Sequence, residues 1–131
     1  MAKLYTDDEL SFLIRGAIFE VHNNLGPGLL EEVYEEALVY ELKQKGLDVK
    51  TQISVPVFYK GVRLSKNYRL DVLVNEQIIV ELKSVEELNK IHYKQLLSYL
   101  RLANLRVGLL VNFNCETIDR NNFERVYNKR A

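Results

Sequence analysis

Several common features are missing from this sequence of 131 residues. Its one cysteine, Cys115, excludes an internal disulfide and a cysteine-rich zinc site, and no companion base in the sequence suggests a nucleophile. No apolar run approaches the roughly 20 residues of a membrane helix. The N-terminal segment turns acidic at once and lacks the apolar core of a signal peptide. We therefore expect a soluble cytoplasmic protein without a membrane partner.

Other absences narrow the organisation and the chemistry. There is no internal repeat, low-complexity segment or linker, so we expect one domain over residues 1–131. The composition, 47% hydrophobic and 27% charged, is that of a globular protein. Gly26-Pro27-Gly28 is not followed by Lys-Ser or Lys-Thr, so it indicates a break between helices and not a phosphate-binding loop. No Ser/His/Asp arrangement is evident, and His22 has no evident role.

A net charge of zero by itself disfavours a nucleic-acid partner, but the charges are unevenly distributed. Residues 1–36 hold eight acids and two bases, a balance of −6. Residues 40–70 hold two acids and seven bases, a balance of +5. A phosphate backbone responds to the local field more than to the total charge. The basic segment therefore permits nucleic-acid binding, although solvated surface lysines would look the same.

Hydrophobic spacing predicts three helices. Thr6 and Glu9 form a capping box for a helix over 7–23. A second helix over 29–45 is ended by Gly46, which can adopt positive φ. A third helix runs from Leu88 or Asn89 to Ala103. The residues expected to face inward on the second helix are Leu30, Val33, Ala37, Leu38 and Leu42.

β-branched and alternating stretches predict the strands between and after these helices. The expected strands cover 49–59, 62–74 with a bend near 65–67, 78–85 and a fully buried 106–113, and an edge strand lies within 117–127. The order ααβββαβ, followed by a weak strand, indicates an α/β protein with a mixed sheet that contains a three-strand meander and is flanked by helices.

Three ionisable residues in two adjacent apolar strands are the most informative feature. Asp71, Glu81 and Lys83 have the spacing D-x9-E-x-K. Charge among Ile, Leu and Val costs free energy unless a partner or an ion compensates it. A divalent cation is the simplest partner, and hydrolysis of a phosphodiester is the simplest reason to hold one. The alternative is a structural ion pair at the end of the sheet.

The turn between the two strands decides whether the carboxylates can meet, because side chains alternate along a strand. A two-residue loop would pair Val74 with Gln77 and separate Asp71 from Glu81. A three-residue loop would pair Val74 with Ile78 and set the two acids opposite each other, where like charges repel and a cation reverses the effect. The metal hypothesis requires the second register.

Magnesium suits such a site because it prefers hard oxygen ligands and usually takes one or two carboxylates. Asp71 and Glu81 would be the direct ligands, and the carbonyl of Leu82 is a plausible third. Lys83 would orient the attacking water or neutralise the phosphate. Arg69, which should share a face with Asp71 and Leu73, could hold a neighbouring phosphate.

Together, Asp71 and Glu81-Leu82-Lys83 resemble the signature of the PD-(D/E)XK nuclease superfamily, without its loosely kept proline. Gln95 and Tyr99 add a Q-x3-Y pattern like that of RecB-type members. Residues 28–34 read G-x-x-E-x-x-Y, and their surroundings also resemble the bacterial GxxExxY family, from about Leu10 to Phe113. The resemblance implies the PD-(D/E)XK nuclease-like fold and an active site, but no known substrate.

The resemblance also implies roles for single residues. Glu31 matches a helix glutamate that can reach the metal, although an acid at a helix N-terminus is also favoured by the dipole. Tyr34 would pack in the core or bond Glu31. Gln95 would face the sheet and act in the site, and Tyr99 would support the site or bind substrate. His92, one turn before Gln95, is a weaker substrate-binding candidate. The interpretation for Glu32, Glu35 and Glu36 is acids favoured by the helix N-terminus or solvated at the surface.

The sequence therefore predicts a nuclease that uses Mg²⁺ or Mn²⁺ and acts on a nucleic acid, most simply DNA. A non-catalytic adaptor with the same fold, binding nucleic acid or a protein, is the alternative. Hydrolysis of another phosphate ester, such as a nucleotide, is a weaker one. The small size of the chain fits a homodimer or a protein that depends on a partner.

Overall fold

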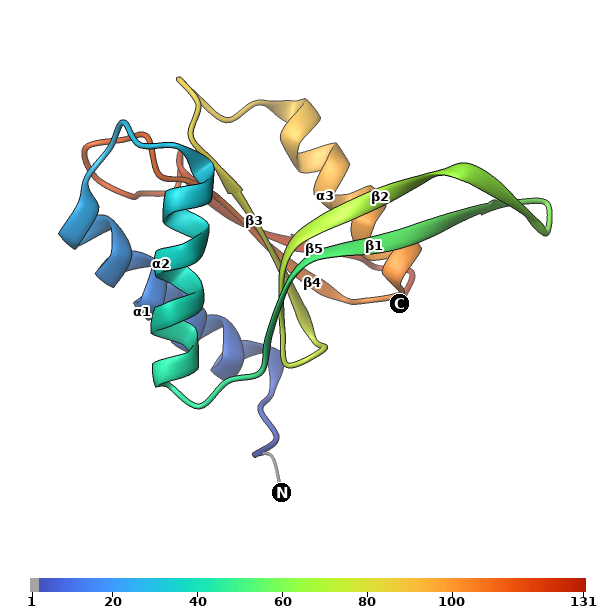
Figure 1. Ribbon diagram of the computed structural model, residues 1–131, viewed down its shortest axis with the longest axis horizontal. Helices are drawn as coiled ribbons and strands as arrows, with labels where there is room; N and C mark the ends of the chain where they lie inside the picture. The colour runs from blue at the N-terminus through green and yellow to red at the C-terminus, as the bar shows by residue number, and fades with distance from the viewer. Residues whose placement is uncertain (1–2) are drawn as a thin grey trace.

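The computed structural model of the protein describes residues 3–131 and contains one five-stranded sheet with helices on both faces (Figure 1). The strands lie in the order β1-β2-β3-β4-β5, and the chain order is the predicted ααβββαβ with a final strand. The elements are α1 (Asp7–Leu25), α2 (Glu31–Gln44), β1 (Val49–Tyr59), β2 (Val62–Val74), β3 (Ile78–Lys83), α3 (Lys90–Ala103), β4 (Val107–Asn112) and β5 (Phe123–Tyr127).

The sheet is mixed because one connection crosses over. β1, β2 and β3 form the expected antiparallel meander, and β5 is antiparallel to β4 at the edge. β3 and β4 are parallel and are joined through α3. As a central parallel strand should be, β4 is buried along its whole length. The predicted α/β class and mixed sheet are confirmed.

Two apolar clusters fill the two sides of this sheet. The first joins α1 and α2 to one face, and residues of the sheet such as Val72 and Val80 belong to it. The second joins α3 to the other face through Leu96 and Leu100, which belong to one cluster with Ile79. Because β2 and β3 contribute to both clusters, their side chains alternate between the layers over this part of the sheet.

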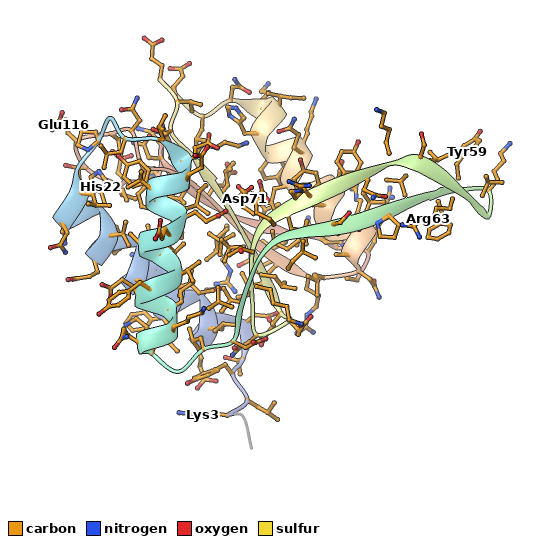
Figure 2. The ribbon with its side chains drawn as sticks, viewed as in Figure 1. Lys3, His22, Tyr59, Arg63, Asp71 and Glu116 are labelled. Carbon is orange, nitrogen blue, oxygen red and sulfur yellow. The ribbon has the colours of Figure 1, made fainter. Side chains whose placement is uncertain are left out.

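The outer part of β1 and β2 leaves this sandwich and extends from the body as a two-stranded arm, which we define as residues 54–69 (Figure 1). Every residue of β2 from Val62 to Arg69 is exposed, whereas Leu70 is 1% exposed. The strand register is irregular between Pro56 and Phe58, across from the predicted bend. Figure 2 shows Tyr59 and Arg63 at the far end of the arm and Asp71 at its base.

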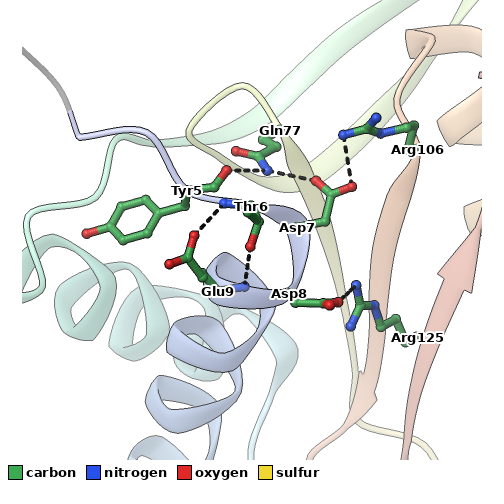
Figure 3. Close-up of polar contacts among 8 residues, drawn as sticks. All are labelled: Tyr5, Thr6, Asp7, Asp8, Glu9, Gln77, Arg106 and Arg125. Carbon is green, nitrogen blue, oxygen red and sulfur yellow. Dashed lines mark hydrogen bonds and ion pairs between the residues drawn. The ribbon is translucent and has the colours of Figure 1, made fainter.

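The N-terminus of α1 is tied to the sheet by polar contacts (Figure 3). Thr6 and Glu9 form the predicted capping box. Asp7 accepts a hydrogen bond from Gln77 at 2.7 Å and forms an ion pair with Arg106 at 3.1 Å. Asp8 accepts a hydrogen bond from Arg125 at 2.6 Å. These contacts fix one end of the helix layer over the sheet.

The second helix differs from its prediction at its start. It begins at Glu31, so Leu30 lies outside the helical turns and is 69% exposed, and Val33 is 42% exposed. The prediction that both face inward is wrong. The buried stripe begins with Tyr34 and continues through Leu38 and Leu42, because the first turn of α2 extends past the edge of the core.

Tyr34 holds the segment before α2 in place. Its ring stacks on Phe113 with centroids 4.5 Å apart. Its hydroxyl donates to the Gly26 carbonyl at 2.6 Å and accepts from the Leu29 N–H at 3.1 Å. The prediction of core packing is confirmed, but the hydroxyl bonds the backbone and not Glu31.

Within residues 3–131, no helix combines the length and apolarity that crossing a membrane requires.

Candidate active site

The register of β2 and β3 is the one that the metal hypothesis requires. Val74 pairs with Ile78, and Val72 pairs with Val80. The intervening turn has Asn75 and Glu76 at positive φ, 53° and 55°. The next position along the ladder sets Asp71 opposite Glu81, as the three-residue connection predicts.

The two carboxylates lie in the gap where β2 and β3 separate. The Asp71 N–H donates to Oε1 of Glu81 at 3.2 Å, and the Leu82 N–H donates to Oδ2 of Asp71 at 3.1 Å. Each side chain thus replaces a backbone partner that the ladder no longer supplies. The two acids are held together by the backbone at the place where the strands part.

Glu81 is 5% exposed, and its electrostatic surroundings are unfavourable for a charge. Burial, and then the charge of Asp71, raise the pKa of Glu81 to about 8, while the hydrogen bond from the Asp71 N–H and then the charge of Lys83 offset the shift only in part. Among residues 3–131, no Lys or Arg nitrogen lies within 4.0 Å of either carboxylate. A buried acid beside a partly buried one, without a direct cationic partner, is the arrangement that a divalent ion compensates.

The alternation of side chains is interrupted beside Asp71. Leu70 and Leu73 pack in the same cluster below α3, although residues three apart on a regular strand face opposite ways. No residue is inserted, because Thr51 pairs with Val72 and Ile53 pairs with Leu70. Between these pairs, Gln52 has φ of 50°.

This twist turns Asp71 toward α2. Asp71 and Arg69 remain on one face of β2, as expected, but Leu73 does not share that face, so this part of the prediction is wrong. The alternation of side chains in the arm is therefore out of step with that in the buried half of β2, and the change occurs at Asp71.

A cavity of about 350 Å³ lies between α2 and the base of the arm. Asp71, Leu82 and Gln52 form one side of it, and acidic residues of α2 form the other. Those acidic residues are Glu31, Glu32 and Glu35. Asp71 thus lies between Glu81, which is buried in the sheet, and an open acidic cavity that could admit an ion.

Glu35 lines the cavity, although the site residues predicted from the sequence do not include it. It is half-buried and accepts a hydrogen bond from the Gln52 amide at 2.7 Å. Burial raises the pKa of Glu35, and the charges of Asp71, Glu32 and Glu31 add to the effect. The interpretation of Glu35 as a solvated acid is therefore wrong. Glu35 is four residues after Glu31, and this spacing places both side chains on one helix face. The spacing is the feature of the sequence that could have predicted its position.

Glu31 lies farther along the same edge of the cavity. Its Oε1 accepts a hydrogen bond from the Ser84 N–H at 3.3 Å, and the Ser84 hydroxyl donates to the Leu29 carbonyl at 2.6 Å. Over the described chain, no three His, Cys, Asp or Glu side chains are gathered closely enough to form a metal-binding group. Two carboxylates are nevertheless a number that Mg²⁺ commonly takes in proteins, with waters completing its shell.

The third helix contributes differently from what its sequence predicts. Tyr99 is half-buried, and its ring lies 5.3 Å from that of Tyr68 at the base of the arm. Burial, followed by the charges of Glu81 and Asp71, raises the pKa of Tyr99, so the phenol lies within the field of the site. Gln95 is exposed and does not face the sheet, because the buried stripe of α3 runs through Leu96 and Leu100.

His92 has a structural contact at the start of α3. Its Nδ1 accepts a hydrogen bond from the Asn89 N–H at 3.2 Å, and the Asn89 side chain accepts from the Ile91 N–H. The two residues form a capping box. Helix capping accounts for this histidine without a substrate contact.

Cys115 does have a basic neighbour, contrary to expectation. Nε2 of the buried His22 is 2.7 Å from the Cys115 carbonyl oxygen and 3.9 Å from Sγ. Burial raises the pKa of the Cys115 thiol, with Asp119 and Glu116 adding to the effect. A raised pKa disfavours the thiolate that a nucleophile needs. The hydrogen bond from His22 to the Cys115 carbonyl is therefore a structural contact.

Comparison with known proteins gives a family and a fold. The family model described as the PD-(D/E)XK nuclease superfamily matches residues 8–126. SSO0001, a protein of known crystal structure, is 18% identical, with a TM-score of 0.54. The alignment covers 90% of this chain and 76% of SSO0001, and at this identity it shows a shared fold alone. None of the curated proteins matches the chain.

Proposed function

This chain belongs to the PD-(D/E)XK nuclease superfamily, and from that premise we propose that it is a metal-dependent nuclease that hydrolyses phosphodiester bonds in DNA. One observation carries the proposal. Asp71 and Glu81 are held side by side at the fork of two strands, without a cation within ion-pair distance among residues 3–131. Keeping two acids there costs stability, and metal binding offsets that cost.

The residues present fit a magnesium or manganese ion. Asp71 and Glu81 would hold it, with the Leu82 carbonyl as a third ligand. Glu31 or Glu35 would complete the shell through water. When bound, such an ion lowers the pKa of water and stabilises charge on phosphate oxygens.

The remaining residues would act on the substrate and the attacking water. Lys83 lies two residues after Glu81 on β3, and its positive charge lowers the pKa of that carboxyl. We assign it to orienting the water or neutralising the phosphate. Arg69 would hold a neighbouring phosphate. Gln95, exposed on the same helix face as Tyr99, would contact substrate or water.

A direct test is to incubate the purified protein with linear, circular and single-stranded substrates, in Mg²⁺, Mn²⁺ or chelator. We expect cleavage that requires the metal and is lost in the Lys83→Ala variant. Equal cleavage by Lys83→Ala would contradict the assignment of Lys83. Cleavage would also distinguish a nuclease from the alternative, a non-catalytic adaptor, which need not cut any substrate. Membership of the GxxExxY family remains a prediction.

A further inference from the structure

The exposed part of β2 has two chemically different faces. Arg69, Asn67 and Arg63 pair with Ser54, Pro56 and Phe58, which alternate along β1, so the three share one face of the arm across the irregular register. One face carries only polar side chains, and we call these four residues the polar track: Arg69, Asn67, Ser65 and Arg63. The other face carries Tyr68, Lys66, Leu64 and Val62.

Contacts at the base of the arm orient these two faces. Leu70 packs in the cluster below α3, and Tyr68 packs against Tyr99 of the same helix. The face with Tyr68 is therefore turned toward α3. The polar track is turned the opposite way, toward the side of the sheet that holds the cavity of Asp71. A row of polar side chains thus leads along one strand to the proposed catalytic acid.

The charge of the arm is opposite to that of the cavity. Residues 57–69 contain four basic residues and no acidic residue. The cavity, in contrast, is lined by four carboxylates, from Glu31, Glu32, Glu35 and Asp71. A phosphate backbone is repelled by such a cavity until a metal ion neutralises it. Attraction to the substrate must therefore come from a neighbouring surface, and the arm is the basic surface that is continuous with Asp71.

We propose that the polar track binds the phosphate backbone of duplex DNA beside the cleavage site, with Arg69 and Arg63 as its two charged contacts. This inference rests on the proposed function and adds the surface that holds the substrate. The β1 partners of Arg69 and Arg63, Ser54 and Phe58, are four residues apart, so the two arginines lie about 14 Å apart along the ladder. At about 3.4 Å per base pair, the track would follow roughly four base pairs. A two-stranded ribbon also has a size that the major groove of DNA admits.

The arm supplies its own matched control. Lys66 lies between the two arginines in the same exposed strand, but on the opposite face. Binding of the full chain to a fluorescent duplex is measured by anisotropy over a series of salt concentrations, with chelator present so that no cleavage occurs. The proteins compared are the original chain, the double variant Arg63→Ala/Arg69→Ala, and Lys66→Ala. Circular dichroism checks that each one is folded.

We expect the double variant to bind more weakly and to lower the slope of log affinity against log salt by nearly 2, because each lost phosphate contact removes about 0.9. Lys66→Ala should keep the slope of the original chain. An equal loss in both variants would mean that only the overall charge matters, and would overturn the proposal. So would an unchanged slope in the double variant, or a loss seen with a single strand but not with the duplex.

Two further outcomes separate this inference from the function on which it rests. If the original chain shows the track-dependent binding but never cleaves DNA in Mg²⁺ or Mn²⁺, the catalytic proposal fails and the arm stands. If it cleaves DNA and the double variant binds and cleaves as well as the original, the arm and the role of Arg69 fail, and the assignment of Asp71, Glu81 and Lys83 stands. A double variant that changes only the oligomeric state, measured by light scattering, would assign the arm to self-association and overturn the proposal.

Discussion

The two halves of β2 share one strand but have opposite environments. From Leu70 to Val74 the strand is buried, apart from Asp71, and it contributes to both apolar clusters. From Val62 to Arg69 it is exposed throughout. Asp71 lies at the boundary, one residue inside the buried half. The core of the fold thus ends at the position where the proposed chemistry begins.

The boundary also explains why a charged residue is tolerated in this strand. In the buried half, β2 pairs with β1 on one side and β3 on the other. At Asp71, β2 and β3 part, and the freed N–H groups of Asp71 and Leu82 donate to carboxylates instead. The fork therefore supplies the hydrogen bonds that partly stabilise both acids, and leaves their mutual repulsion for a cation to relieve.

The largest expected effect is on cleavage. Asp71→Ala and Glu81→Ala should each lower the metal-dependent rate by at least about a thousandfold, because metal ions contribute several kcal/mol to phosphoryl chemistry. Circular dichroism in chelator should show a retained fold. Glu36→Ala removes an exposed acid of α2 that does not line the cavity, and it should cut DNA at the original rate. Normal cleavage by either site variant would break the assignment.

A pair of identical substitutions tests the structural side of the comparison. Leu70→Ala removes a side chain that is 1% exposed, and should lower the free energy of unfolding by about 2–5 kcal/mol. Leu64→Ala, on the arm, removes one that is 41% exposed, and should change it by no more than about 0.5 kcal/mol. Urea denaturation measures both. Similar losses would mean that the arm is packed in solution.

The buried acid predicts a pH dependence of stability. Because the pKa of Glu81 is raised in the folded state, its contribution is full below about 4.5, its ordinary value, and is lost as the pH rises toward about 8. In chelator, stability should therefore fall over this range, by at most about 1.4 kcal/mol per pH unit. Glu81→Gln should remove this slope. A slope that survives in Glu81→Gln would have to come from other groups.

The smallest effect concerns the twist at the boundary. Gln52 has φ of 50°, which costs a residue with a side chain about 1 kcal/mol or more relative to glycine. Gln52→Gly and Gln52→Ala both lose the hydrogen bond to Glu35, and they differ in this strain, which is the larger effect, and in the freedom that glycine adds to the unfolded chain. Gln52→Gly should therefore be more stable than Gln52→Ala by about 1 kcal/mol in thermal denaturation. Equal stabilities would show that the strain is not stored there.

Much of the fold was predictable because its signals are local. The capping box of α1, the glycine that ends α2 and the buried strand at Val107–Asn112 each follow from a few neighbouring residues. The sequence left two registers of β2 and β3 open, and the structure has the one that sets Asp71 opposite Glu81. Family membership agrees with the resemblance found in the sequence.

The wrong predictions concern residues whose burial and orientation are set by tertiary packing. Glutamine is not a residue that favours positive φ, so nothing in the sequence indicated the twist at Gln52 that turns Asp71 toward α2. The burial of Glu35 depends on Gln52, which comes from a distant strand. The sequence predicts that Gln95 faces the sheet, but leucines of α3 occupy that side. These features depend on how the helices pack against the sheet, which no single segment of the sequence specifies.

The most direct test of the central claim is a thermal denaturation series with increasing Mn²⁺ at a pH of about 8, where Glu81 loses its proton. If Asp71 and Glu81 bind one divalent ion, the melting temperature should rise with the metal concentration, as expected for a ligand that binds the folded state. The rise should be lost in both Asp71→Asn and Glu81→Gln, but kept in the exposed control Glu36→Gln. A melting temperature that does not change with the metal concentration, or an equal rise in all four proteins, would contradict the account.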